Sequence, residues 1–251
     1  MDRLFAEPEL AALYDLFCAW DRRDDLDFYL PLVLAADSVL DVGCGTGMLL
    51  RRARQDGHKG RLCGLDPAAA MLGVARARSD VEWIEGDLPS AGFDQEFDLV
   101  VMTGHAFQVL TGDTQLRAAL AAIARALARN GRFAFETRNP GARAWEQWVP
   151  ANAAEAADAA GRVFRQSHQV ELPVTGELVT FAVTYTSPSW PQPRVSHSTL
   201  RFLGASALRG FLSAAGLTVA EQYGDWSRRP LTDASPEIIT IARRAGPGRH
   251  P

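Results

Sequence analysis

Short apolar segments alternate with amphipathic segments along the first 140 residues. The apolar segments predict five strands, at residues 38–42, 61–65, 81–85, 97–102 and 132–136. Apolar residues at helical spacing predict three helices between them, at residues 48–55, 68–78 and 114–129. Because strands and helices alternate, we expect an α/β fold with a doubly wound, mostly parallel sheet.

The pattern changes after Pro140, where apolar and polar residues alternate as in half-exposed strands. Three such strands are predicted, at residues 162–170, 178–185 and 195–203. Proline and glycine turns separate them, which favours antiparallel pairing. The remaining predicted elements are helices at 7–17, 24–34 and 205–215 and two last strands at 217–223 and 237–242.

Composition and charge exclude some classes of function. The chain has 251 residues, of which 47% are hydrophobic, and a net charge of −4. We therefore expect no nucleic-acid partner, since binding its phosphates requires a basic surface. Cys18, Cys44 and Cys63 form no metal-ligand pattern, so we expect no metal and a reducing compartment. The start of the chain lacks signal-peptide features and no apolar stretch reaches 18 residues, so we expect a cytoplasmic protein without membrane contact.

A glycine-rich loop follows the first predicted strand. The sequence Asp41-Val42-Gly43-Cys44-Gly45-Thr46-Gly47 joins this strand to a helix, and Asp66 ends the next strand. Such a loop lets a ligand approach the backbone closely, and Asp66 can accept hydrogen bonds from both hydroxyls of an adenosine ribose. Nicotinamide dinucleotide sites share this arrangement, but they need Gly or Ala where this chain has Met48.

Four motifs and a turn together resemble a known family. They are 41–47, Asp66, Glu85-Gly86-Asp87-Leu88, the apolar strand 97–102, and the turn at Gly216 that precedes the last two strands. The set resembles the class I S-adenosylmethionine-dependent methyltransferases. This resemblance implies S-adenosylmethionine as the cofactor and a seven-stranded sheet that ends in an antiparallel hairpin.

The resemblance also implies roles at the methionine end of the cofactor. Gly43, Cys44 and Gly45 would line it through their backbone, and Asp41 would orient its amino group. Thr103 follows the fourth strand and would lie beside the sulfonium. The alternative is that the glycines only form a turn.

Other residues would hold the adenosine end. Asp66 would bind the ribose, Asp87 would accept from the adenine amino group, and the Leu88 N–H would donate to the ring. Met71 would cover an adenine face, and Tyr14 would close the site from an N-terminal helix. The alternatives are a helix cap for Asp66, a turn role for Asp87 and core packing for Met71 and Tyr14.

His105 is the candidate catalytic residue. It follows the fourth strand, at the sheet edge where ligands bind in open α/β folds. It could accept a proton from the acceptor, orient the acceptor, or be a structural histidine. His58, His168, His197 and His250 have no partner pattern, so we expect them to be structural or on the surface.

The domain organisation follows from these assignments. We expect residues 1–37 to close the cofactor site, and 38–139 with 204–244 to form the cofactor domain. The insertion 140–203 would be a substrate cap or a dimer element, and 245–251 a tail. The aromatic residues of the insertion could line a pocket or only pack together.

The sequence thus predicts methyl transfer to an oxygen or nitrogen of a small metabolite, by a monomer or homodimer. A cofactor-binding protein without turnover and a nucleotide-dependent oxidoreductase are the alternatives.

Overall fold

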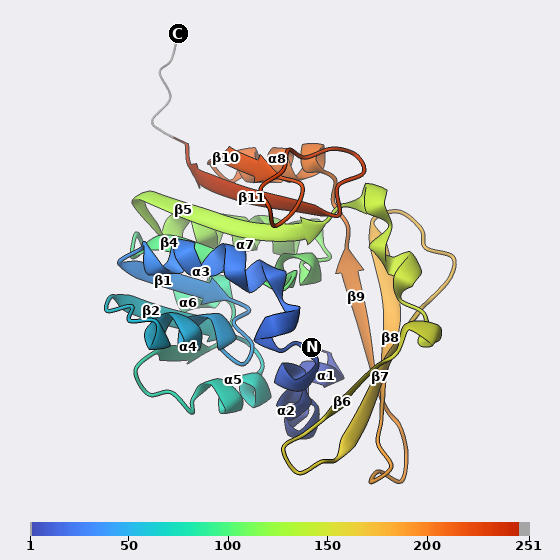
Figure 1. Cartoon of the computed structure of the whole chain (residues 1–251). Coiled ribbons are helices and arrows are strands. Elements are labelled where there is room, and N and C mark those ends of the chain that lie inside the picture. Colours follow the sequence, from blue (N-terminus) through green and yellow to red (C-terminus); the bar gives the residue numbers. More distant parts are fainter. Residues whose placement is uncertain (1, 246–251) are drawn as a thin grey trace.

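A computed structural model describes residues 2–245 and shows one seven-stranded sheet and one four-stranded sheet (Figure 1). The strand order in the larger sheet is β10-β11-β5-β4-β1-β2-β3. Its strands are β1 (Ser38–Val42), β2 (Arg61–Asp66), β3 (Glu82–Glu85), β4 (Phe97–Met102), β5 (Leu127–Arg138), β10 (Leu217–Tyr223) and β11 (Glu237–Arg244). Strands β1 to β5 are parallel, whereas β11 runs antiparallel to both β5 and β10. The predicted fold class is confirmed, including the closing hairpin.

Helices cover both faces of the larger sheet, as the alternating pattern predicts. Apolar side chains of α3 and α4 pack on one face, and those of α6, α7 and α8 pack on the other. The helices are α1 (Arg3–Ala6), α2 (Pro8–Phe17), α3 (Asp24–Leu34), α4 (Met48–Gln55), α5 (Ala69–Ala75), α6 (Leu88–Ala91), α7 (Asp113–Ala126) and α8 (Ala205–Ala214). Short 3-10 helices are η1 (Trp20–Arg22), η2 (Ala106–Val109), η3 (Pro140–Ala142), η4 (Ala144–Gln147) and η5 (Pro150–Asn152). Within residues 2–245, no helix combines the length and apolar character needed to cross a membrane.

The boundary between α7 and β5 differs from the prediction. The helix ends at Ala126 instead of residue 129, and Leu127 already pairs with Phe97 of β4. The pairing then shifts, so that Arg132 lies opposite Leu99. The Asn130-Gly131 sequence therefore marks an irregularity within a strand and not the end of a helix.

The four-stranded sheet is antiparallel and is formed by the insertion, in the order β6-β7-β8-β9. Its strands are β6 (Ala154–Ala157), β7 (Val163–Val170), β8 (Leu178–Thr186) and β9 (Arg194–Arg201). Strand β6 has no predicted counterpart. Alanine has a weak preference for strands, so this strand depends on its pairing with β7.

The N-terminal helices connect the two sheets. Leu10, Leu13 and Phe17 share a buried cluster with residues of the inserted sheet, including Phe181. On its other side, α2 contacts the glycine loop through Asp15, which accepts a hydrogen bond from the Thr46 hydroxyl. Figure 1 shows α1 and α2 between the carboxyl ends of the parallel strands and β7 to β9. Of the predicted tail, only Ala245 lies among the described residues.

Candidate active site

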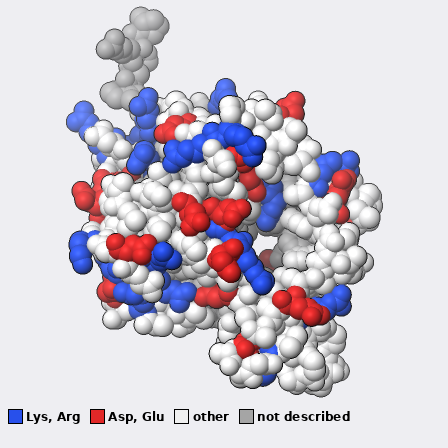
Figure 2. Space-filling view, in the orientation of Figure 1, with Lys and Arg blue, Asp and Glu red and all other residues white. Residues whose placement is uncertain are grey.

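A cavity of about 400 Å³ lies between the larger sheet, the N-terminal helices and the inserted sheet. The space-filling view shows a hollow between the main body and the inserted sheet (Figure 2). Seven of the predicted site residues line the cavity: Tyr14, Gly43, Gly45, Asp66, Met71, Thr103 and His105. Asp41 and Cys44 line a recess of about 30 Å³ that shares Tyr14 and Gly43 with the cavity. Asp87 and Leu88 line neither space.

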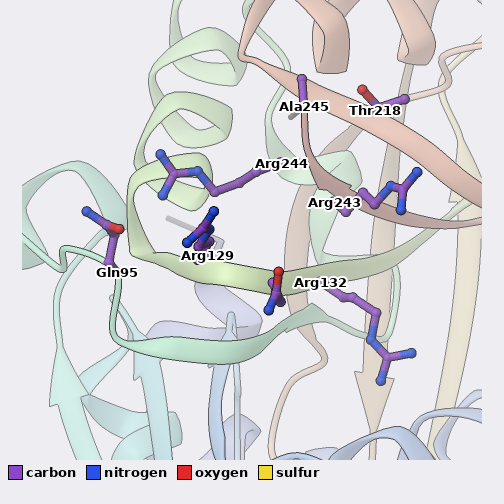
Figure 3. Close-up of a pocket in the computed structure, with 8 residues that line it drawn as sticks. Gln95, Arg129, Arg132, Thr218, Arg243, Arg244 and Ala245 are labelled. Atoms are coloured by element: carbon purple, nitrogen blue, oxygen red, sulfur yellow. The ribbon is translucent and has the colours of Figure 1, made fainter. Parts of the chain in front are cut away.

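A larger hollow of about 830 Å³ lies at the start of β5 and the end of β11 (Figure 3). Four arginines line it: Arg129, Arg132, Arg243 and Arg244. It contains none of the predicted site residues. The candidate site is therefore the smaller cavity, at the carboxyl ends of the parallel strands.

The glycine loop lines the cavity with backbone. Gly45 has a left-handed φ of +55°, which favours glycine, and its N–H donates to Asp66 Oδ2 at 2.8 Å. A Cβ atom at Gly45 would lie 3.1 Å from Met71 Cε. The loop conformation therefore favours glycine at this position, and a side chain there would also displace the end of Met71.

Asp66 is held rigidly at the end of β2. Its two carboxylate oxygens accept from the N–H groups of Gly45 and Ala68, each at 2.8 Å. Burial raises the pKa of Asp66, and the two N–H donors oppose that rise. Because each oxygen has further lone pairs, the carboxylate can serve the loop and a bound hydroxyl together.

Asp41 presents an unsatisfied acceptor to the recess. The residue is 1% exposed, and its Oδ1 atom has no hydrogen-bond partner among the described residues. Burial, and secondarily the charge of Asp66, raises its pKa to about 7. Arg23 lines the same recess and is held by Asp25 through bonds of 2.7 and 2.5 Å. An acceptor beside a fixed guanidinium suits a ligand with both an ammonium and a carboxylate group.

His105 is fixed by two glutamates. Its backbone is left-handed, with φ at +62°, and its N–H donates to Glu136 at 2.6 Å. Its Nε2 atom lies 3.0 and 3.1 Å from the carboxylate oxygens of Glu237. Tyr29 donates its hydroxyl to the other oxygen of Glu136 at 2.5 Å. Glu237 therefore orients the imidazole at the cavity wall, while Glu136 and Tyr29 hold the backbone of His105 in place.

Burial shifts the protonation of this pair. Burial and the nearby Arg138 lower the pKa of His105 well below its usual range, while burial raises that of Glu237 to about 8. His105 is thus neutral at pH 7, when Glu237 holds a proton. Burial and the charge of Asp25 likewise raise the pKa of Glu136 to about 8.

The inserted sheet supplies the other wall. Phe181 and Tyr185 line the cavity. Trp145 instead packs edge-on against Phe202, with 4.7 Å between the ring centres. The aromatic residues of the insertion are thus divided between lining and packing. His168 also lines the cavity, a position that its sequence context did not indicate. His58 is buried, with Nε2 bonded at 2.7 Å to a backbone carbonyl, as a structural histidine should be.

Sequence reasoning missed Arg23, Arg138 and Glu237. Arg138 ends β5, so the rule that ligands bind at the carboxyl ends of parallel strands could have found it. Glu237 begins β11 and lies opposite Arg138 only because these strands pair antiparallel. Arg23 lies in an irregular link before α3 and carries no sequence signal.

Comparisons with known proteins identify the family to which the chain belongs. Residues 39–131 match a family described as a methyltransferase domain. The chain is 31% identical to the dTDP-3-amino-3,6-dideoxy-alpha-D-glucopyranose N,N-dimethyltransferase of Streptomyces fradiae, over 91% of both chains. It is 37% identical to the 2-phytyl-1,4-naphtoquinone methyltransferase of Thermosynechococcus vestitus, over 55% of this chain. The match covers 66% of that methyltransferase, slightly less than two thirds of its length. A methyltransferase structure from Clostridium acetobutylicum aligns with a TM-score of 0.74 at 16% identity, over 95% of this chain and 98% of that chain.

The chain therefore belongs to the class I S-adenosylmethionine-dependent methyltransferases, and the predicted family and cofactor are confirmed. The residues fit this cofactor. The unsatisfied Asp41 oxygen and Arg23 suit the ammonium and carboxylate of its methionine part, and Asp66 suits its ribose. In the described part of the chain, no group of three or more His, Cys, Asp or Glu residues is arranged to hold a metal ion.

Proposed function

We propose that this methyltransferase methylates a nitrogen atom of a small metabolite, with His105 and Glu237 accepting the proton. The observation that carries the proposal is the shared cavity, which joins the cofactor loop to the inserted sheet with His105 in its wall. The relative from Streptomyces fradiae supports nitrogen as the acceptor atom, since its printed name is that of an amino-sugar N,N-dimethyltransferase. The same cavity would also admit a hydroxyl acceptor.

When bound, S-adenosylmethionine supplies a methyl group on a sulfonium, which a nucleophile displaces from the side opposite the leaving thioether. The protein positions the nucleophile and excludes water from the cavity, chiefly with Phe17, Phe181 and Val183. The His105–Glu237 pair takes the proton that an amine loses on methylation.

The proton on Glu237 decides whether His105 can be a base. When Glu237 is protonated it donates to Nε2, so the other ring nitrogen carries the imidazole proton and accepts none. When Glu237 is ionised, Nε2–H donates to it and the other ring nitrogen becomes an acceptor. Basicity therefore develops as Glu237 loses its proton, at about pH 8.

We also propose a bacterial, cytoplasmic protein that acts as a monomer or homodimer. Cys18, Cys44 and Cys63 are all free thiols, which suits a reducing compartment, and the two relatives described above are bacterial.

The test is incubation of the protein with methyl-labelled S-adenosylmethionine and a bacterial metabolite extract. We expect a small labelled product whose NMR spectrum places the methyl group on nitrogen. A label on oxygen would correct the acceptor atom. Tight cofactor binding without any labelled product would favour the alternative of a cofactor-binding protein without turnover.

A further inference from the structure

Arg138 extends from the end of β5 into the wall of the cavity. One guanidinium nitrogen, Nη1, donates to Gln108 Oε1 at 3.0 Å, and Gln108 in turn donates to the Arg201 carbonyl at 3.0 Å. The guanidinium also lies over the Trp148 ring, 5.1 Å from its centre. This side chain is therefore fixed by a buried amide and an aromatic ring, both of which are neutral.

No carboxylate of the described chain forms an ion pair with this guanidinium, although the charges of Glu237 and Glu136, when ionised, favour it. Within residues 2–245, no carboxylate lies at ion-pair distance from Arg138, and its Nε and Nη2 atoms donate to no acceptor. Arg23 and Arg201, whose side chains are 16% and 12% exposed, each pair with a carboxylate. Arg138 is half-buried, and a partly desolvated cation without a partner is costly, which points to a counter-ion that arrives with a ligand.

Glu237 is a candidate for that counter-ion within the protein, but it is engaged elsewhere. It lies opposite Arg138 in the β5–β11 pair, but its carboxylate oxygens bond to His105. With a pKa of about 8, it is also mostly protonated at pH 7. The positive charge of Arg138 therefore remains available to the cavity.

Neutral polar side chains of the inserted sheet line the same cavity as Arg138. His168 and Gln166 line it from the inserted sheet, and the Gln166 amide donates to the Tyr185 hydroxyl at 2.6 Å. Ser198 also lines the cavity, but its hydroxyl donates to Asp2. Burial, and secondarily Arg138, lowers the pKa of His168, so this imidazole is neutral and can donate one N–H. A fixed guanidinium beside neutral donors matches the oxygens of a carboxylate or phosphate.

We propose that the methyl acceptor carries an anionic group, a carboxylate or a phosphate, and that Arg138 binds it. This inference rests on the proposed function, because it places the acceptor in the cavity that His105 lines. Arg138 then selects anionic amines over neutral ones and fixes their position relative to the methyl group.

The first test measures anion binding without turnover. Protein loaded with S-adenosylhomocysteine is titrated with inorganic phosphate, pyrophosphate and acetate by calorimetry. We expect saturable binding of at least one anion, weakened tenfold or more in Arg138→Gln and less in Arg138→Lys. Arg165→Gln, an exposed arginine of β7, is the matched control and should bind like the wild type. The anion that binds best distinguishes a phosphate-bearing acceptor from a carboxylate-bearing one.

The second test separates this inference from the proposed function. Methyl transfer to glucosamine, glucosamine 6-phosphate and glycine is followed with labelled cofactor, after confirming that each variant melts like the wild type. Arg138→Gln should lose its preference for the anionic amine and keep cofactor affinity within about threefold. Equal anion binding by wild type and Arg138→Gln, or none by the wild type, overturns the inference even if amines are methylated. Anion binding that depends on Arg138 supports it even if none of the three amines is the acceptor.

Discussion

The cofactor side and the acceptor side of the cavity are built in different ways. Asp41, Gly45 and Asp66 come from one strand–loop–helix–strand segment, in which the chain neighbours are also the spatial neighbours. By contrast, His105 and Glu237 are 132 residues apart and meet only through the pairing of distant strands. The difference teaches that a cofactor site can be encoded locally, whereas an acceptor site depends on the completed fold.

The two sides also differ in their electrostatics. On the cofactor side, Asp66 is fixed by two backbone N–H groups. On the acceptor side, Glu237 has a pKa near 8, close to the pH at which an enzyme works, and Arg138 has no carboxylate partner among the described residues. Mutations on the first side should change cofactor affinity, and mutations on the second side should change turnover.

The largest expected effect is on the cofactor side, from Gly45→Val. Valine cannot adopt the left-handed backbone without strain, and its Cβ would meet Met71 Cε at 3.1 Å. We expect calorimetry to detect no binding of S-adenosylmethionine while the circular dichroism spectrum stays native. Gly73→Val is the matched control, since a Cβ there meets nothing within 4 Å. Normal binding by Gly45→Val would show that the loop is only a turn.

The next largest effect is on the acceptor side, from His105→Ala. We expect methyl transfer to fall about a hundredfold, the lower end of the usual contribution of a general base. Cofactor affinity should stay within about threefold, because His105 follows β4 and does not belong to the glycine loop. A fall of tenfold or less would indicate that His105 only orients the acceptor. Loss of cofactor affinity would indicate that His105 is part of the cofactor-binding site.

The pH dependence of turnover tests the His105–Glu237 pair directly. Burial raises the pKa of Glu237 to about 8, so the fraction of ionised Glu237 rises about tenfold per pH unit below 8. We expect turnover to rise with pH through this range and then to level off. Glu237→Gln should remove this rise of turnover with pH, but it should not remove a rise that is caused by deprotonation of the acceptor amine. An identical pH profile in Glu237→Gln would exclude the pair as the proton acceptor.

The comparison also explains what the sequence could predict. The glycine loop and Asp66 are adjacent to strands whose apolar pattern is clear, so their positions follow from local rules. The contact between His105 and Glu237 needs the register of β5 and β11, which no local pattern specifies. Strand β6 has an alanine-rich sequence without strand preference, and it forms because β7 offers a partner.

A smaller effect on the cofactor side is expected from Asp66→Ala. Loss of hydrogen bonds to a charged group weakens binding by roughly 1.5–3 kcal/mol, or about 10- to 150-fold. The same change frees the N–H of Gly45, so weaker binding alone would not distinguish ribose contact from a loosened loop. An S-adenosylhomocysteine analogue without ribose hydroxyls makes the distinction. If Asp66 binds the ribose, the mutation should cost the analogue far less affinity than it costs the parent compound. Equal losses would assign Asp66 to the loop.

The smallest expected effect concerns Asp87, which is predicted to contact adenine. In the structure this residue lines neither the candidate-site cavity nor the adjoining recess. Its exposed carboxylate caps α6 by accepting from the Ser90 N–H at 3.0 Å and from the Ser90 hydroxyl. Because water competes for exposed hydrogen bonds, we expect Asp87→Ala to weaken cofactor binding only about threefold to tenfold. Ser90→Ala is the control, since it removes the hydroxyl partner and leaves the carboxylate free to meet adenine. A loss in Asp87→Ala alone, absent for an inosine analogue that lacks the amino group, would place Asp87 at the adenine. Equal small losses in both variants would make Asp87 a helix cap, and the adenine end of the site would then depend on Met71 and the backbone.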